Sequence, residues 1–195
     1  MKLKALGLAA VAAMALTAFT AGSASATTLE VGGVKQNKAV TLEGSLKAGT
    51  STLWMRTDGS FANTCSGSTV KGSTVTPFTG TTLTGPSSSL SFPICDRPAT
   101  AHKAGTLHVE SIAGTTDGTV SSSGTEVTVG SIFGTLNCKT SSGVDIGTLT
   151  GTDGTPSTHA EMDINAVLDC GFLVPSASWK GTYVVTSPTG LGVVA

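Results

Sequence analysis

Apolar and polar residues alternate along several stretches of this chain. The clearest stretch is 160–169, where one face carries Ala160, Met162, Ile164, Ala166 and Leu168, and most positions between them are acidic or polar. The same period of two recurs over 40–47 and 107–110. Successive side chains of a strand point to opposite faces, so this period indicates strands with one buried and one solvated face.

The stretches between these segments favour turns rather than helices. Almost nothing after residue 26 has the 3.6-residue period of a helix, and Thr and Val are the frequent strand-formers. Thr-Asp-Gly recurs at 57–59, 116–118 and 152–154, and Asp-Gly readily supplies the positive φ angles of tight hairpins. A calcium loop is the alternative for these aspartates, but it needs several oxygen ligands within one short segment.

These patterns predict one all-β domain over residues 27–195. We expect a two-sheet β-sandwich of short antiparallel strands in preference to a closed barrel. Cys65 and Cys138 are 73 residues apart, and Cys95 and Cys170 are 75 residues apart. This near-constant offset suggests two duplicated halves, 40–110 and 117–186, although chance similarity between Gly- and Thr-rich stretches would produce a comparable pattern.

The first 26 residues have the features of a secretory signal peptide. Lys2 and Lys4 precede an uncharged apolar run over 5–19, and Ala24-Ser25-Ala26 forms a small-x-small cleavage site. The mature chain is then expected to begin at Thr27. An uncleaved membrane anchor is the alternative, but a spanning helix needs about 20 apolar residues, and no later segment has that length.

Four cysteines lie in the expected mature chain, which predicts disulfides after export. Their spacing favours Cys65–Cys95 and Cys138–Cys170, with separations of 30 and 32 residues. A zinc site is the competing interpretation and would need close pairs such as C-x2-C, which this sequence lacks. We therefore expect two disulfides, no metal site and no cofactor.

Charge restricts the classes of partner. Charged residues make up 12% of the chain and the formal net charge is −1. The chain therefore has no basic surface of the kind that binds nucleic acid.

Candidate catalytic residues are few. A Ser-His-Asp triad would have to use His102, His108 or His159, and no G-x-S-x-G motif is present. Glu161, Asp163 and Asp169 share the wet face of one predicted strand and form a candidate surface acidic site, for a cation or a glycosidase-type pair. Polar-out alternation alone also explains these three carboxylates.

Two aromatic residues are candidates for ligand contact. Trp179 and Tyr183 are four residues apart and can share one strand face, as stacking residues of sugar-binding modules do. Packing in the core near Cys170 is the alternative for both rings.

Short motifs link the chain to secreted bacterial proteins. Cys65-Ser66-Gly67-Ser68, Phe92-Pro93-Ile94-Cys95 and Gly105-Thr106-Leu107 resemble segments of small secreted β proteins of unassigned function, common in actinobacteria. The chain is also similar to the secreted proteins called activators of alkane oxidation. The resemblance implies export and a β fold, and it assigns no role to any residue here.

The expected function is that of a secreted or envelope-associated, non-enzymatic β protein that binds a partner or coats a surface. Two alternatives remain open at this point. One is a secreted hydrolase that uses the strand-face carboxylates near Glu161, and the other is a carrier that holds an apolar small molecule between its sheets.

Overall fold

Strands are the elements that build the described part of the protein. A computed structural model describes residues 26–56, 62–132, 134–172 and 174–195, and that part of the chain contains no helix. The strands are β1 (Thr28–Val31), β2 (Val34–Lys35), β3 (Thr41–Leu46), β4 (Thr52–Arg56), β5 (Ala62–Ser73), β6 (Thr82–Cys95), β7 (Ala99–Lys103), β8 (Thr106–Ser111), β9 (Gly118–Ser123), β10 (Glu126–Ser131), β11 (Gly134–Lys139), β12 (Val144–Thr150), β13 (Glu161–Asp169), β14 (Ser176–Ser187) and β15 (Leu191–Val194). The expected all-β class is confirmed.

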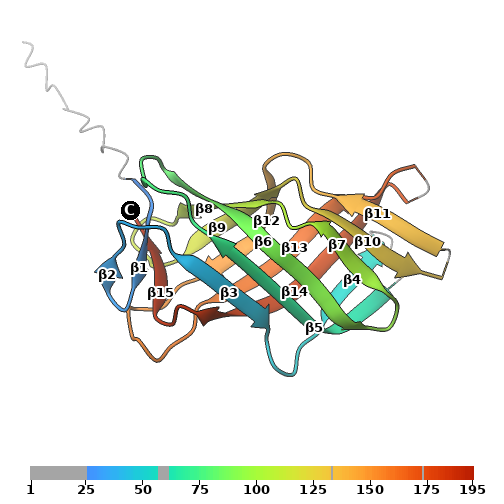
Figure 1. Ribbon diagram of the computed structural model, residues 1–195, viewed down its shortest axis with the longest axis horizontal. Coiled ribbons are helices and arrows are strands. Elements are labelled where there is room, and N and C mark those ends of the chain that lie inside the picture. Colours follow the sequence, from blue (N-terminus) through green and yellow to red (C-terminus); the bar gives the residue numbers. More distant parts are fainter. Residues whose placement is uncertain (1–25, 57–61, 133, 173) are drawn as a thin grey trace, which may run out of the picture.

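The main sheet closes on itself as an eight-position antiparallel barrel (Figure 1). Strands β5, β6, β8, β9, β12, β13 and β14 follow one another around the ring. Strands β3 and β4 together fill the eighth position, because both pair with β14 on one side and with β5 on the other. Closure leaves these strands without an open edge, which is the usual solution to unpaired backbone groups in all-β proteins.

Of the two architectures considered from the sequence, the closed barrel is therefore found in place of the favoured two-sheet sandwich. The physical reason is the ladder between β14 and β3, in which Tyr183 faces Leu46 and Val185 faces Gly44. This ladder joins segments about 140 residues apart, and alternation within either strand carries no information about such a partner.

Three further strands form a small sheet beside the barrel. Strand β10 lies between β7 and β11, and β11 joins the main sheet through the pair Lys139–Asp169. The inner face of this small sheet buries Val127, Val129 and Cys138 against the core, while its outer face is polar.

One end of the barrel is covered by a separate sheet of β1, β2 and β15 (Figure 1). Leu29, Leu191 and Val193 from this sheet are buried. Backbone hydrogen bonds hold it in place, from Thr152 N to Leu191 O (2.8 Å) and from Val193 N to the carbonyl oxygen of Thr116 (2.8 Å). The first described strand, β1, thus pairs with the last, β15, and together they cover one end of the barrel.

Both predicted disulfides are present. Cys65 and Cys95 lie directly opposite each other on β5 and β6, and Cys138 of β11 is bonded to Cys170, which follows β13. The second bridge ties the small sheet to the barrel wall, next to its one ladder pair with β13.

The alternation predicted for 160–169 is confirmed in β13. Ile164, Ala166 and Leu168 are buried, and the residues that alternate with them, Asp163, Asn165 and Val167, are exposed. The strands expected within 40–47 and 107–110 correspond to β3 and β8. The signal peptide over 1–26 lies almost wholly outside the described residues, and the duplicated halves remain a prediction.

Two of the three Thr-Asp-Gly tripeptides lie in described loops. Asp117 ends the β8–β9 connection, and its carboxylate accepts a hydrogen bond from Gly151 N at 2.9 Å. Asp153 lies in the longer loop before β13, where the hydroxyl and N–H of Thr155 hold the pKa of its carboxyl below the ordinary value. Gly154 has the expected positive φ of 83°, whereas Gly118 does not. The tripeptide at 57–59 falls outside the described residues.

Candidate functional site

The barrel encloses an apolar cavity of about 90 Å³ near its covered end. Every one of the eight positions around the ring contributes to its wall, and Leu191 of β15 contributes from the covering sheet. The wall residues that carry the argument below are Leu42, Val70, Val109, Val120, Leu149 and Met162. These side chains belong to the inward sets of their strands, so the cavity is a direct product of the alternation.

A second, smaller cavity lies deeper in the same interior. Its volume is about 20 Å³, and it shares Val70, Leu107, Met162 and Tyr183 with the first. Met162 borders both spaces, and an unbranched thioether side chain adapts its shape more readily than a branched one. Apolar cavities of this kind stay dry and accept apolar guests, as shown by a cavity of roughly 150 Å³ that binds benzene. The larger cavity here suits an apolar group of a few carbon atoms.

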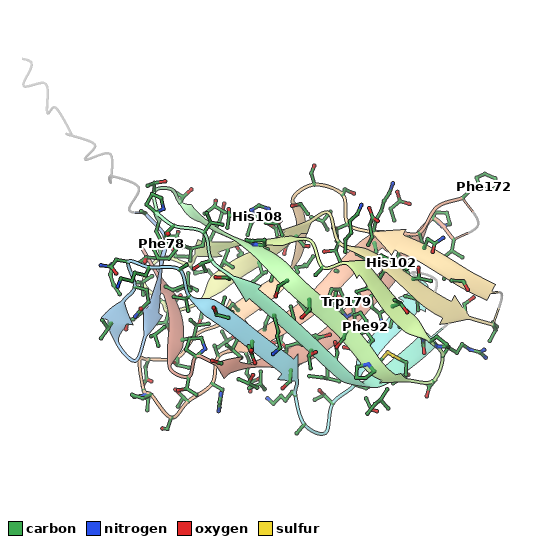
Figure 2. All side chains as sticks on the ribbon, viewed as in Figure 1. Phe78, Phe92, His102, His108, Phe172 and Trp179 are labelled. Carbon is green, nitrogen blue, oxygen red and sulfur yellow. A yellow bond between two sulfur atoms is a disulfide. The ribbon has the colours of Figure 1, made fainter. Side chains whose placement is uncertain are left out.

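An aromatic cluster closes the interior on the other side of the cavities. Trp54 and Trp179 stack with their ring centroids 5.3 Å apart and their planes 6° from parallel. Phe92 meets both indoles edge to face, at 5.3 and 6.0 Å. Figure 2 shows Phe92 and Trp179 within the barrel, and Phe172 by contrast on an outward loop.

Tyr183 places a phenol hydroxyl in the interior of the barrel. Its hydroxyl donates a hydrogen bond to Ser68 Oγ (2.9 Å) and accepts one from Thr52 Oγ1 (3.1 Å). Burial raises the pKa of the Tyr183 phenol. The hydroxyls of Ser68 and Thr52 act in the opposite direction, as does the Trp179 indole, whose N–H falls short of hydrogen-bond geometry. The hydroxyl is therefore held neutral and directed at the barrel wall.

This raised pKa predicts a measurable pH dependence. The unfolded chain releases the Tyr183 proton near pH 10, whereas the native protein retains it, so the free energy of unfolding falls as pH rises above 10. Because Tyr183 is the chain's single tyrosine, tyrosinate absorbance at 295 nm reports this residue alone. We expect half-titration near pH 10 in urea, and a titration midpoint above pH 10 in the native protein. Half-titration of the native protein at pH 10 would contradict the buried hydroxyl.

The three candidate carboxylates are on the outer face of β13, and each has its own partner. Glu161 forms an ion pair with Lys47 at 2.7 Å, Asp163 accepts a hydrogen bond from Thr182 Oγ1 at 2.6 Å, and Asp169 accepts one from Gly171 N at 2.9 Å. Within the described residues, no group of three or more His, Cys, Asp or Glu side chains could hold a metal ion. The structure therefore brings Glu161 and Asp163 together on one face but does not combine them with Asp169 into a site.

The two candidate aromatic contacts are both inside the barrel. Trp179 is 6% exposed and Tyr183 is 1% exposed. An exposed ring is required for stacking on a sugar, so these residues have the alternative role in the core. Both also line the smaller cavity.

The three histidines are on separate elements. His102 is on β7, His108 is on β8 between Thr84 and Ser123, and His159 precedes β13 with its Nδ1 2.8 Å from the carbonyl oxygen of Val185. The hydrogen-bond partners of the three rings among the described residues are hydroxyl or carbonyl oxygens, and none is a carboxylate. The described residues thus show no Ser-His-Asp arrangement.

The cavity is the functional feature that was not located from the sequence. The local signal is Gly44, which stands between Leu42 and Leu46 in the inward set of β3, but a Cβ there would lie 3.1 Å from Val70 Cγ1, so Val70 already takes the space that this glycine leaves. A glycine on an inward face indicates a cavity only when the neighbouring strands are known, because a side chain from another strand can fill the space beside it.

Comparisons with known proteins gave no match. In the described residues, no helix has the length and apolar character needed to cross a membrane. No protein-family model matches this chain, and no similar protein was found among curated proteins or among solved structures.

Proposed function

We propose that this protein is an exported binding protein that takes a small apolar molecule into the interior of its barrel. The observation that supports the proposal is the cavity of about 90 Å³ bounded by aliphatic side chains from all eight barrel positions. Small-molecule sites are typically concave, largely apolar and lined from several elements, as this one is.

The energetics favour an apolar guest. Transfer of apolar surface from water contributes roughly 25 cal/mol per Å², and an empty apolar space lacks the dispersion contacts that a guest supplies. The one charged residue that lines the cavity, Glu43, pairs its carboxylate with Lys71 at 2.8 Å, and the Tyr183 phenol is already hydrogen-bonded to Ser68 and Thr52. The site therefore selects for shape and low polarity, and the guest expected from the volume is a short aliphatic chain or a small ring.

Export is part of the proposal. Two disulfides are consistent with an oxidising extracellular environment. The apolar run over 5–19 after Lys2 and Lys4 supports a secretory signal. A secreted or envelope-associated carrier would encounter apolar compounds outside the cell, where they partition onto surfaces.

Methionine methyl NMR can test the occupancy of the cavity. Met162 lines both cavities. We expect its 13C-methyl signal to shift and then saturate when butane or pentane is added to the mature protein. The absence of a shift, or a shift that grows with hydrocarbon concentration without saturating, would contradict the proposed site.

A matched pair of substitutions separates cavity binding from adsorption to the surface. Val120→Phe fills the cavity from β9, and overpacking of this kind costs about 1–3 kcal/mol. Val167→Phe makes the same change at a side chain that is 54% exposed on the outer face of β13. We expect at least a tenfold loss of hydrocarbon affinity for Val120→Phe and no change for Val167→Phe, provided that both variants remain folded by circular dichroism.

A further inference from the structure

A second concave site lies on the outside of the molecule, away from the barrel interior. It is a groove of about 260 Å³ where the polar outer face of β7, β10 and β11 meets the turn between β6 and β7. Its lining residues are Arg97, Pro98, Thr100, Thr128, Gly130, Ser131, Gly134 and Thr135. A Cβ at Gly130 would lie 3.0 Å from Arg97 Cβ and 3.0 Å from the carbonyl oxygen of Pro98, so this glycine lets the turn between β6 and β7 pack directly on the sheet.

The turn that carries Arg97 is fixed on several sides. Asn63, whose side chain is fully buried, accepts a hydrogen bond from Arg97 N and donates one to Arg97 O, both at 3.0 Å. The carbonyl oxygen of Pro98 accepts a hydrogen bond from Gly130 N at 2.7 Å. The Cys65–Cys95 disulfide lies two residues before Arg97. The backbone at Arg97 is therefore held in place before any ligand arrives, which lowers the entropic cost of binding.

The polar groups in and beside the groove are arranged to donate. Thr128 Oγ1 donates to Asn137 Oδ1 at 2.9 Å, so His102 Nε2, which is 2.6 Å from the same hydroxyl, carries a hydrogen and donates to it. The hydrogen bonds from His102 to Thr128 and from Thr128 to Asn137 fix the orientation of the Asn137 side chain. Its Oδ1 accepts from Thr128, and its NH₂ group can donate to a ligand. The hydroxyls of Thr100 and Thr135 form no hydrogen bond with any described residue. Both hydroxyls can therefore form hydrogen bonds with the hydroxyls of a ligand without breaking one inside the protein.

The charge in the groove is positive. No carboxylate lines it, and the Arg97 guanidinium forms no ion pair with a described residue. By contrast, Lys103 on the same face is paired with Glu126 at 2.6 Å. A guanidinium is a planar fork that binds a carboxylate, sulfate or phosphate through two parallel hydrogen bonds.

We propose that this groove binds a saccharide that carries an anionic group. The anion pairs with the Arg97 fork, and the ring hydroxyls bind to the hydroxyls of Thr100 and Thr135. The net charge of −1 gives the chain no general attraction for polyanions, so binding of such a ligand requires a local site. This site is independent of the apolar cavity, because no residue lines both.

Affinity electrophoresis or calorimetry with defined saccharides tests the proposal. The probes are alginate oligosaccharides for the carboxylate, dextran sulfate oligosaccharides for the sulfate, and a neutral dextran of equal length. We expect the wild-type protein to bind at least one anionic probe and to bind the neutral dextran at least tenfold more weakly. Absence of binding to both anionic probes, or equal binding of dextran, would overturn the proposal.

Substitutions then locate the binding. Arg97→Gln should reduce the affinity for the anionic probe at least tenfold, and Arg97→Lys should restore only part of it because the two-pronged geometry is lost. Lys180→Gln, at an exposed position on β14, removes the same charge without touching the groove and should leave affinity unchanged. If Arg97→Gln and Lys180→Gln weaken binding equally, the interaction is general electrostatics and the site is wrong. Unchanged thermal melting of both variants shows that folding is not the cause.

Discussion

Replacing Phe92 with alanine is expected to lower the free energy of unfolding by about 3–5 kcal/mol. The Phe92 side chain is 6% exposed and packs edge to face against both stacked indoles of the interior. Its removal leaves a cavity beside Trp54 and Trp179 that the closed wall cannot collapse to fill. Urea unfolding followed by tryptophan fluorescence measures the loss directly, because both indoles of the chain are in this cluster.

The same substitution at Phe172 is the matched control. Phe172 is 97% exposed on the loop after β13, so Phe172→Ala should change the free energy of unfolding by no more than about 0.5 kcal/mol. Equal losses for the two variants would show that the aromatic cluster is not the core of the protein.

Removal of either disulfide is expected to cost about 3.6 kcal/mol on the chain-entropy estimate. The two bridges close loops of 30 and 32 residues, so Cys65→Ala with Cys95→Ala and Cys138→Ala with Cys170→Ala should destabilise to nearly the same extent. Urea unfolding of the two double variants, without reductant, provides the comparison. The wild-type protein with its disulfides reduced should match a variant that lacks all four cysteines.

The two bridges differ in what they hold together. The Cys65–Cys95 bridge reinforces a pair of long strands that already share an extended ladder, whereas Cys138–Cys170 supports the small sheet, which meets β13 through a single ladder pair. We therefore expect faster amide exchange in β10 and β11 when the second bridge is removed, and no such change when the first is removed. Stability equal to that of the wild type in either double variant would contradict the predicted contribution.

The local structure of this chain was predictable from its sequence because local structure depends on neighbouring residues. The period of two in 160–169 identified both the strand and its buried face, and the cysteine spacing identified both bridges. Closure of the barrel was not predictable in the same way. It depends on the β14 ladders with β3 and β4, whose partners come from the opposite end of the chain.

For the candidate sites too, the sequence predicted the local arrangement but not the contacts between distant segments. The sequence placed Glu161, Asp163 and Asp169 on a wet face correctly, but it could not show that Lys47, Thr182 and Gly171 N would each engage one of them. The even spacing of Trp179 and Tyr183 put them on one face without indicating that this face points into the barrel. The apolar cavity and the Arg97 groove are each assembled from residues distant in the chain, so neither leaves a compact motif.

A crystal structure of the mature protein under xenon pressure tests the central proposal most directly, because xenon binds in dry apolar cavities. We predict xenon bound between Val120, Leu149 and Met162, inside a closed eight-position barrel. An interior at this place filled by side chains, or one that takes up no xenon while other apolar sites do, would contradict it.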